Sequence, residues 1–140
     1  MTALELLKAE IDDAGYQLTK TMEGLDDVGA EHKATPDSMS AKEMIEHLAE
    51  AYVALSTEVA GGKHSWGTYK AADPTWVGVQ SEWKSARDKA ADAALGAGTD
   101  AAIMLAHDFI VAHDYYHVGQ MVTLRLSLDP QFNFYGIYQH

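Results

Sequence analysis

Four segments of the chain repeat apolar residues at intervals of three and four, and this periodicity constrains the fold more than any other feature. Such spacing places apolar side chains on one face of an α-helix. The segments span about 3–25, 41–60, 75–95 and 100–128. No stretch shows the strict alternation that is typical of a half-buried strand. The sequence therefore predicts an all-α protein: a four-helix bundle of the up-and-down type with one long connection.

Capping residues mark the expected helix ends. Thr2 with Glu5 and Ser40 with Glu43 have the spacing of capping boxes. The other signals are Asp73-Pro74 or Thr75 before the third helix, Thr99 or Asp100 before the fourth, and Gly61-Gly62, Gly96, Gly98 and Asp129-Pro130 as stops. These signals leave a linker at about 26–37, a longer ordered loop between the second and third helices, and an irregular aromatic C-terminal tail.

Length and composition favour one domain spanning residues 1–140. A chain of this size with 47% hydrophobic residues can bury a sizeable core without cross-links. Cysteine is absent, which excludes disulfides, cysteine-bound zinc, iron–sulfur clusters and a cysteine nucleophile. No apolar run approaches membrane-spanning length, and the acidic N-terminal segment does not resemble a signal peptide. We therefore expect a cytoplasmic protein.

The charge balance excludes two classes of partner. The formal net charge is −11, and Arg87 and Arg125 are the only arginines. Nucleic-acid binding depends on clustered Lys and Arg, and anionic membrane surfaces attract the same residues. We expect neither nucleic acid nor a membrane as a partner.

Three histidines are the candidate functional residues. His113 and His117 form an H-x-x-x-H pair in the segment H-D-Y-Y-H, and His47 lies within the apolar stripe of the second helix. Histidines four apart stack on one helix face, roughly 6 Å apart along the axis, so both rings can reach one ion. A third histidine from a facing helix would complete a site with open coordination positions, as in catalytic metal centres. The pattern predicts a metal site at His47, His113 and His117.

A structural alternative stays open, because buried histidines are also satisfied by hydroxyls or carbonyls. The remaining histidines are expected to be solvated: His32, His64 and His140 by their positions in loops or at the chain end, and His107 because it lies about 120° around the helix from His113. Neither an H-E-x-x-H motif nor paired E-x-x-H motifs occur. Zinc proteases and di-iron bundles are thus disfavoured.

Two segments carry a resemblance to a known family. They are M-S-A-K-E-M-I-E-H-L-A-E-A-Y and, about sixty residues later, H-D-F-I-V-A-H-D-Y-Y-H-V-G-Q-M-V-T-L-R. Together they resemble the DinB/YfiT-like family of bacterial four-helix-bundle metalloenzymes. The resemblance implies a divalent metal, nickel or zinc, bound by His47, His113 and His117.

The resemblance also implies a chemistry. The family's best understood relatives transfer or isomerise with low-molecular-weight thiols, bacillithiol or mycothiol, whose pKa the metal lowers. A cysteine-free protein can perform this reaction because the cosubstrate supplies the sulfur. We therefore expect a small detoxification or stress enzyme that transfers a thiol to an electrophile. The alternatives are a metal-dependent hydrolase at the same site, a non-catalytic metal-binding or ligand-binding bundle, and a purely structural bundle.

Other residues are expected around the site. Gln120 follows His117 by three positions, so its amide either bonds a metal-bound water or the His117 ring, or makes a polar contact at a helix crossing. Trp66 and Tyr69 are the candidates for a substrate pocket, because the long connection can reach the open end of the bundle. The surplus of Trp and Tyr predicts a homodimer or an aromatic-lined cleft.

Overall fold

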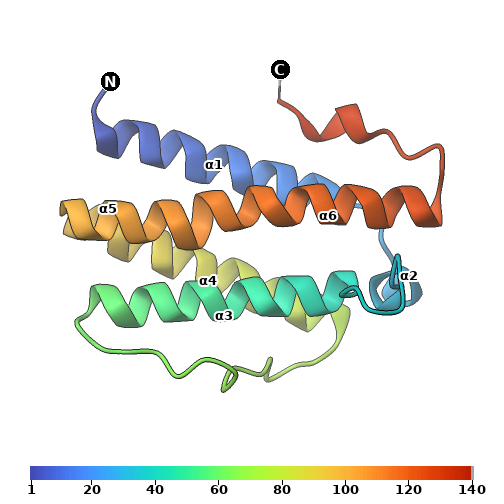
Figure 1. The fold of residues 1–140 in the computed structure, drawn as a ribbon, viewed down its shortest axis with the longest axis horizontal. Helices are drawn as coiled ribbons and strands as arrows, with labels where there is room; N and C mark the ends of the chain where they lie inside the picture. The colour runs from blue at the N-terminus through green and yellow to red at the C-terminus, as the bar shows by residue number, and fades with distance from the viewer. Residues whose placement is uncertain (140) are drawn as a thin grey trace.

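The structure, a computed structural model, describes residues 1–139 and contains no strand within that range. Its long helices lie side by side (Figure 1). They are α1 (Ala3–Met22), α3 (Ala41–Val59), α4 (Trp76–Ala97) and a continuous rod of α5 (Asp100–Ala106), the π-helical segment η1 (His107–Ala112) and α6 (His113–Leu128). Two short elements complete the chain, α2 (Asp27–Glu31) and the 3₁₀ helix η2 (Phe134–Ile137). The protein is all-helical, as predicted.

The 60–75 connection determines the directions in which the helices run. It runs back along the outside of α3, so α4 starts at the same end of the molecule as α3 (Figure 1). As a result α3 and α4 point in one direction, and α1 and the α5–η1–α6 rod point in the other. α3 packs mainly on α4, and α1 packs mainly on α6.

The capping signals are confirmed. Thr2 and Ser40 both form full capping boxes with the glutamates three residues later. The hydroxyls of Thr75 and Thr99 accept hydrogen bonds from the first turns of α4 and α5. Gly98 ends α4 in the left-handed conformation, at φ 63°, which glycine adopts without steric cost. These contacts satisfy backbone groups that helix ends otherwise leave unpaired.

Two elements differ from the sequence-based expectation. The linker at 26–37 contains α2, which starts where the Asp26 carboxylate accepts a hydrogen bond of 2.7 Å from the Gly29 N–H. The helix expected over 100–128 is continuous but widens into η1 directly before His113. Single π-helical turns of this kind recur at functional sites.

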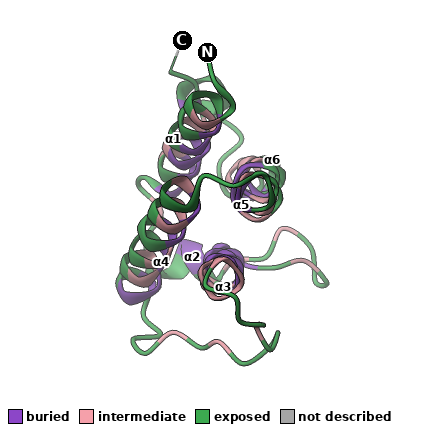
Figure 2. Ribbon diagram, turned by 90° about the vertical axis from the view of Figure 1, so that its left-hand side faces the viewer, coloured by how far each residue is buried: buried purple, intermediate pink, exposed green. Residues whose placement is uncertain are grey.

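The core lies between the four long helical segments, each of which carries buried residues (Figure 2). On α3 the stripe includes Met44, Leu48, Ala51 and Leu55, all at most 2% exposed. The tail folds back so that Ile137 of η2 is buried near α1. No helix within residues 1–139 combines the length and apolarity that crossing a bilayer requires.

A polar network crosses this core beside α6. The Asp114 carboxylate, with 0% exposure, accepts hydrogen bonds from the Tyr52 hydroxyl and from Arg87 Nε and Nη2, at 3.1 and 2.8 Å for the arginine. Trp83 donates to the Tyr52 hydroxyl at 3.2 Å. Arg87 Nη2 also donates to the Ile11 carbonyl at 2.6 Å, so the network joins α1, α3, α4 and α6.

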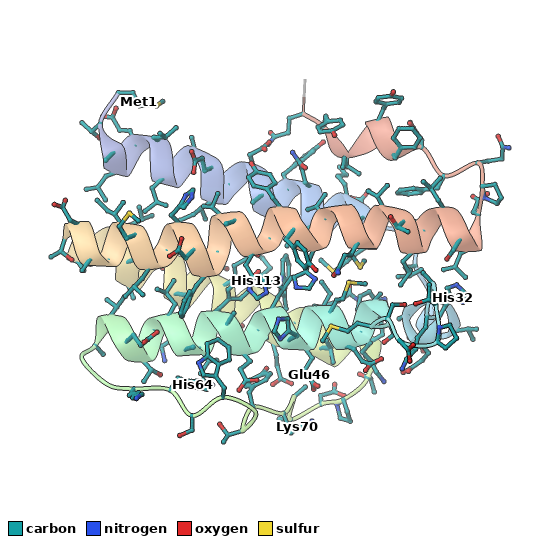
Figure 3. The ribbon with its side chains drawn as sticks, in the orientation of Figure 1. Met1, His32, Glu46, His64, Lys70 and His113 are labelled. Atoms are coloured by element: carbon teal, nitrogen blue, oxygen red, sulfur yellow. The ribbon has the colours of Figure 1, made fainter. Side chains whose placement is uncertain are left out.

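Carboxylates of α3 hold the 60–75 connection in place. Glu50 Oε2 accepts hydrogen bonds from His64 Nε2 and from the Gly67 N–H, both at 2.8 Å. Glu46 accepts from the Ala71 N–H at 3.0 Å, and Figure 3 shows Glu46 and His64 on the side of α3 that faces the loop. The expectation that His64 is solvated is therefore wrong, because a carboxylate fourteen residues earlier binds its ring.

Candidate metal centre

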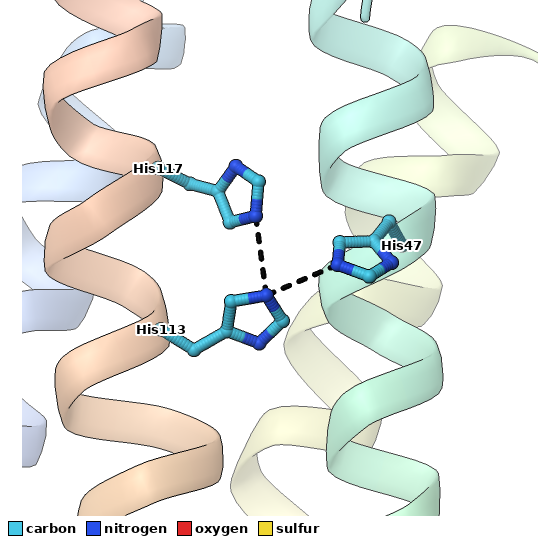
Figure 4. A group of neighbouring side chains, drawn as sticks. All are labelled: His47, His113 and His117. Atoms are coloured by element: carbon cyan, nitrogen blue, oxygen red, sulfur yellow. Dashed lines mark hydrogen bonds between the residues drawn. The ribbon is translucent and has the colours of Figure 1, made fainter.

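Three imidazole rings meet between α3 and α6. His47 comes from the middle of α3, and His113 and His117 come from the first turns of α6 (Figure 4). His113 Nε2 lies 3.0 Å from His47 Nε2 and 3.2 Å from His117 Nε2. One potential ligand atom from each ring lies within 4.8 Å of the others. The predicted convergence of these three histidines is confirmed, and the group could hold a metal ion.

Neighbouring elements fix this arrangement. The i, i+4 spacing sets the two α6 rings one turn apart. η1 ends at the residue before His113, and the next residue is the buried Asp114. Asp114 anchors the first turn of α6 to Arg87 on α4 and Tyr52 on α3, so the backbone that carries His113 is attached to two neighbouring helices.

The electrostatics favour neutral rings. Burial, and then the neighbouring His113 and His47, lower the pKa of His117 to about 4. Burial and His47 also lower the pKa of His113. Both rings are therefore neutral at pH 7, which is the form that binds a metal. The donor set fits a divalent transition ion, because imidazole nitrogen is a ligand suited to zinc and nickel.

The outer contacts of His117 are incomplete. Its Nδ1 is buried and has no hydrogen-bond partner among residues 1–139. Gln120 is exposed, and its amide donates to the Tyr116 hydroxyl at 3.1 Å. The Tyr116 ring in turn packs edge-on against the His117 ring, with centroids 5.1 Å apart. Gln120 is thus linked to the His117 ring through Tyr116.

A pocket of about 690 Å³ opens at the three histidines. We call it the histidine pocket. Its other lining residues come from the 34–39 segment and from α3 and α6: Ala34, Thr35, Asp37, Ser38, Met39, Met44, Tyr116, Gly119, Gln120, Thr123 and Leu124. Among the described residues that line it, Asp37 is the one carboxylic acid, and the lining has no Lys or Arg. The pocket provides room for a small substrate next to the rings.

The candidate pocket residues of the long connection lie on the other side of α3. Tyr69 lines a smaller depression of about 180 Å³ that also touches His47. Trp66 is 55% exposed and packs against His64 and Phe109, with ring centroids 5.1 and 6.0 Å apart. Neither residue lines the histidine pocket.

The other histidines that the structure describes lie apart from the cluster. His32 lies near α2, away from His113, and contacts Ser127 Oγ at 3.0 Å (Figure 3). His107 is exposed, with its Nδ1 3.6 Å from Glu10 Oε2. His140 lies outside the described residues.

Comparisons with protein-family models, curated proteins and solved structures give no match to this chain. The candidate centre is therefore defined by its own geometry.

Sequence reasoning missed the residues that surround the cluster. A signal for the polar network was present: Arg87 continues the buried stripe of α4 that contains Trp76, Val79 and Trp83. An arginine at a core position requires a buried acid. Asp37 had no comparable signal, because its place in the pocket depends on how the 34–39 segment folds. Tyr116 did have one, since it follows His113 by three positions on the same helix and belongs to the surplus of Trp and Tyr.

Proposed function

We propose that this protein is a metal-dependent enzyme of the DinB/YfiT-like four-helix-bundle class that transfers a low-molecular-weight thiol to an electrophile. His47, His113 and His117 would hold one nickel or zinc ion. The observation that carries the proposal is the meeting of three imidazoles in the lining of a pocket large enough for a small substrate. Three protein ligands leave coordination positions free.

The bound ion would supply Lewis acidity that lowers the pKa of a thiol next to it. In the transfer, the thiol proton passes to solvent, the sulfur bonds to an electrophilic carbon, and the leaving group departs with the electrons of its bond. The protein needs no nucleophile of its own, in agreement with the absence of cysteine.

The chain's own residues would bind and orient the substrate. The Tyr116 hydroxyl, the Gln120 amide and the Thr123 hydroxyl line one wall and can bond polar groups. Met44 and Leu124 line the pocket with apolar surface that would exclude water from the reacting groups. Among residues 1–139 no Lys or Arg lines the pocket, so these residues offer no cationic side chain there to bind a strongly anionic thiol.

The test is a panel of thiols (bacillithiol, mycothiol, coenzyme A, glutathione and cysteine) assayed against a fluorogenic bimane electrophile. Metal-loaded protein, metal-free protein and the His113→Ala variant are compared. We expect turnover with at least one thiol that requires both the metal and His113. Conjugation that is equal in the three samples, or absent with every thiol, would contradict thiol transfer.

Hydrolysis is the second candidate, and one observation favours it. Asp37 places a carboxylate in the pocket wall, and hydrolases that activate a metal-bound water use such groups as bases. A panel of esters and amides, assayed with wild type and Asp37→Asn, tests this alternative. Metal-dependent hydrolysis that falls in Asp37→Asn would select it, whereas metal binding without turnover in either panel would indicate a non-catalytic binding protein.

A further inference from the structure

A second cavity lies between α1 and α4, on a different side of the bundle from the metal centre. It has a volume of about 650 Å³ and shares no lining residue with the histidine pocket. We call it the α1–α4 cleft. It forms because α1 packs mainly on α6 and α4 mainly on α3, which leaves the seam between α1 and α4 loosely filled. Figure 2 shows these two helices next to each other along one edge of the molecule.

Buried side chains lie at the bottom of the cleft. Trp83 is 5% exposed and Arg87 is 8% exposed, although both line it. Gly15 lies opposite Arg87, and a Cβ at that position would come within 2.5 Å of Arg87 Nη1. The absence of a side chain at Gly15 thus allows the guanidinium to reach the backbone of α1.

Arg87 retains an unused hydrogen-bond donor at this place. Its Nε and Nη2 bond Asp114 and the Ile11 carbonyl, whereas Nη1 has no partner among residues 1–139. Of the Arg87 atoms, Nη1 lies nearest the position that a Cβ of Gly15 would take, and Gly15 and Arg87 both line the cleft. A nearly buried guanidinium with a free N–H is a strong site for an acceptor atom.

Hydrogen bonds fix the backbone at the end of the cleft near Leu25. Trp76 Nε1 donates to the Leu25 carbonyl at 3.0 Å, and Arg125 Nη1 donates to the Thr21 and Glu23 carbonyls at 2.7 Å each. The chain that leaves α1 is thereby held from two sides. A preformed cavity spares a ligand the entropy of ordering its walls.

The surrounding charges define the class of ligand. Asp114 already neutralises Arg87, and the rim carries Asp12, Glu23 and Asp88 against Lys84 alone. An anion would therefore be repelled by the rim. Tyr16, Met22 and Trp83 offer aromatic and apolar walls. We propose that the α1–α4 cleft is a second small-molecule site, which takes an uncharged aromatic compound whose oxygen accepts a hydrogen bond from Arg87 Nη1.

Three probes of similar size test this class by NMR: benzamide, toluene and benzoate. The indole N–H signal of Trp83 reports binding, and the signal of Trp66, which does not line the cleft, serves as the reference. We expect benzamide to shift the Trp83 signal saturably at about millimolar concentration. Toluene, which lacks the acceptor, and benzoate, which is repelled, should bind about tenfold more weakly. Equal binding of the three probes, or no saturable shift with benzamide, would overturn the proposal.

Matched variants locate the site. Thr19→Phe on α1 and Lys84→Phe on α4 each fill the cleft from an exposed wall position, and Thr123→Phe fills the histidine pocket instead. Benzamide should still shift Trp83 in Thr123→Phe and should lose its effect in the folded cleft variants. Persistence of the shift in a folded cleft variant, or its loss in Thr123→Phe, would place the probe elsewhere and contradict the proposal. The readout involves neither metal nor turnover, so it is independent of the proposed function.

Discussion

Asp114 of α6 binds side chains from two neighbouring long helices, Tyr52 of α3 and Arg87 of α4. Burial raises its pKa to about 6, while the Arg87 guanidinium and the Tyr52 hydroxyl favour the charged form and limit the rise. The carboxylate is therefore ionised at pH 7 and paired with Arg87. A buried ion pair contributes little to the stability of the fold compared with apolar packing. Losing one member, however, leaves the other charged, buried and unpaired.

Replacing Asp114 by Asn should accordingly lower the free energy of unfolding by about 3–5 kcal/mol. Asp88→Asn is the matched control, because it removes one member of the exposed Lys84–Asp88 pair and should change stability little. Urea denaturation of both variants measures the difference. Equal losses in the two variants would show that the buried network does not stabilise the fold in this way.

Some residues of the site could be predicted from the sequence and others could not. His47, His113 and His117 were predictable because a helix converts spacing along the chain into position on a face, and all three lie at inward positions. His64 was not, because its contact with Glu50 depends on the path of an irregular loop. Local periodicity predicts contacts between helices but not the side chains that a loop brings to them.

Among the elements, the long helices and their caps followed from local patterns, whereas α2 and η1 did not. α2 has five residues, which are too few to show the spacing of apolar residues that is typical of a helix. η1 preserves an apolar helical pattern while widening one turn, and no local residue preference marks such a turn.

The 60–75 connection is held to α3 by a pH-dependent contact. Burial alone would raise the pKa of Glu50, but hydrogen bonds from His64 and from the Gly67 and Tyr69 N–H groups outweigh it, and the pKa lies below its ordinary value of 4.5. A carboxyl group with a lowered pKa stabilises the folded state above the unfolded pKa and loses this contribution as the pH falls through the folded value. The loop should therefore stay attached at neutral pH and loosen in acid below pH 4.5.

The Gly67 amide tests this expectation, since it donates directly to Glu50. Its hydrogen exchange should be slow at pH 7 in the wild type and faster in Glu50→Gln, which weakens the acceptor. Glu58→Gln, in the last turn of the same helix, is the control and should leave the exchange unchanged. Fast exchange of Gly67 in the wild type at pH 7 would show that Glu50 does not hold the loop.

At the scale of the whole molecule, the exposed aromatic residues bear on assembly. Tyr116, Phe134, Tyr135 and Tyr138 are all at least 40% exposed. Aromatic side chains are enriched at interfaces between subunits. We therefore predict a homodimer, with a mass of twice 15.3 kDa by light scattering at micromolar concentration. Tyr135→Ser, at a 72% exposed position, should weaken it. A wild-type mass of one chain would refute the dimer.

The connectivity of the molecule brings the candidate ligands together. The last rod starts beside the end of α4 and runs along α3, so the H-x-x-x-H pair of α6 lies next to the middle of α3 (Figures 1 and 4). His47 and His113 are 66 residues apart in the chain, yet their Nε2 atoms lie 3.0 Å apart. We propose that one divalent ion binds where these rings meet.

The metal content of the purified protein tests this binding. Wild type, His47→Ala, His113→Ala, His117→Ala, and the controls His32→Ala and His107→Ala are purified from medium supplemented with nickel or zinc and analysed by elemental mass spectrometry. We predict one ion per chain in the wild type and both controls, and a sharp loss in each of the three cluster variants. A wild type without stoichiometric metal, or an equal loss in all five variants, would contradict the account.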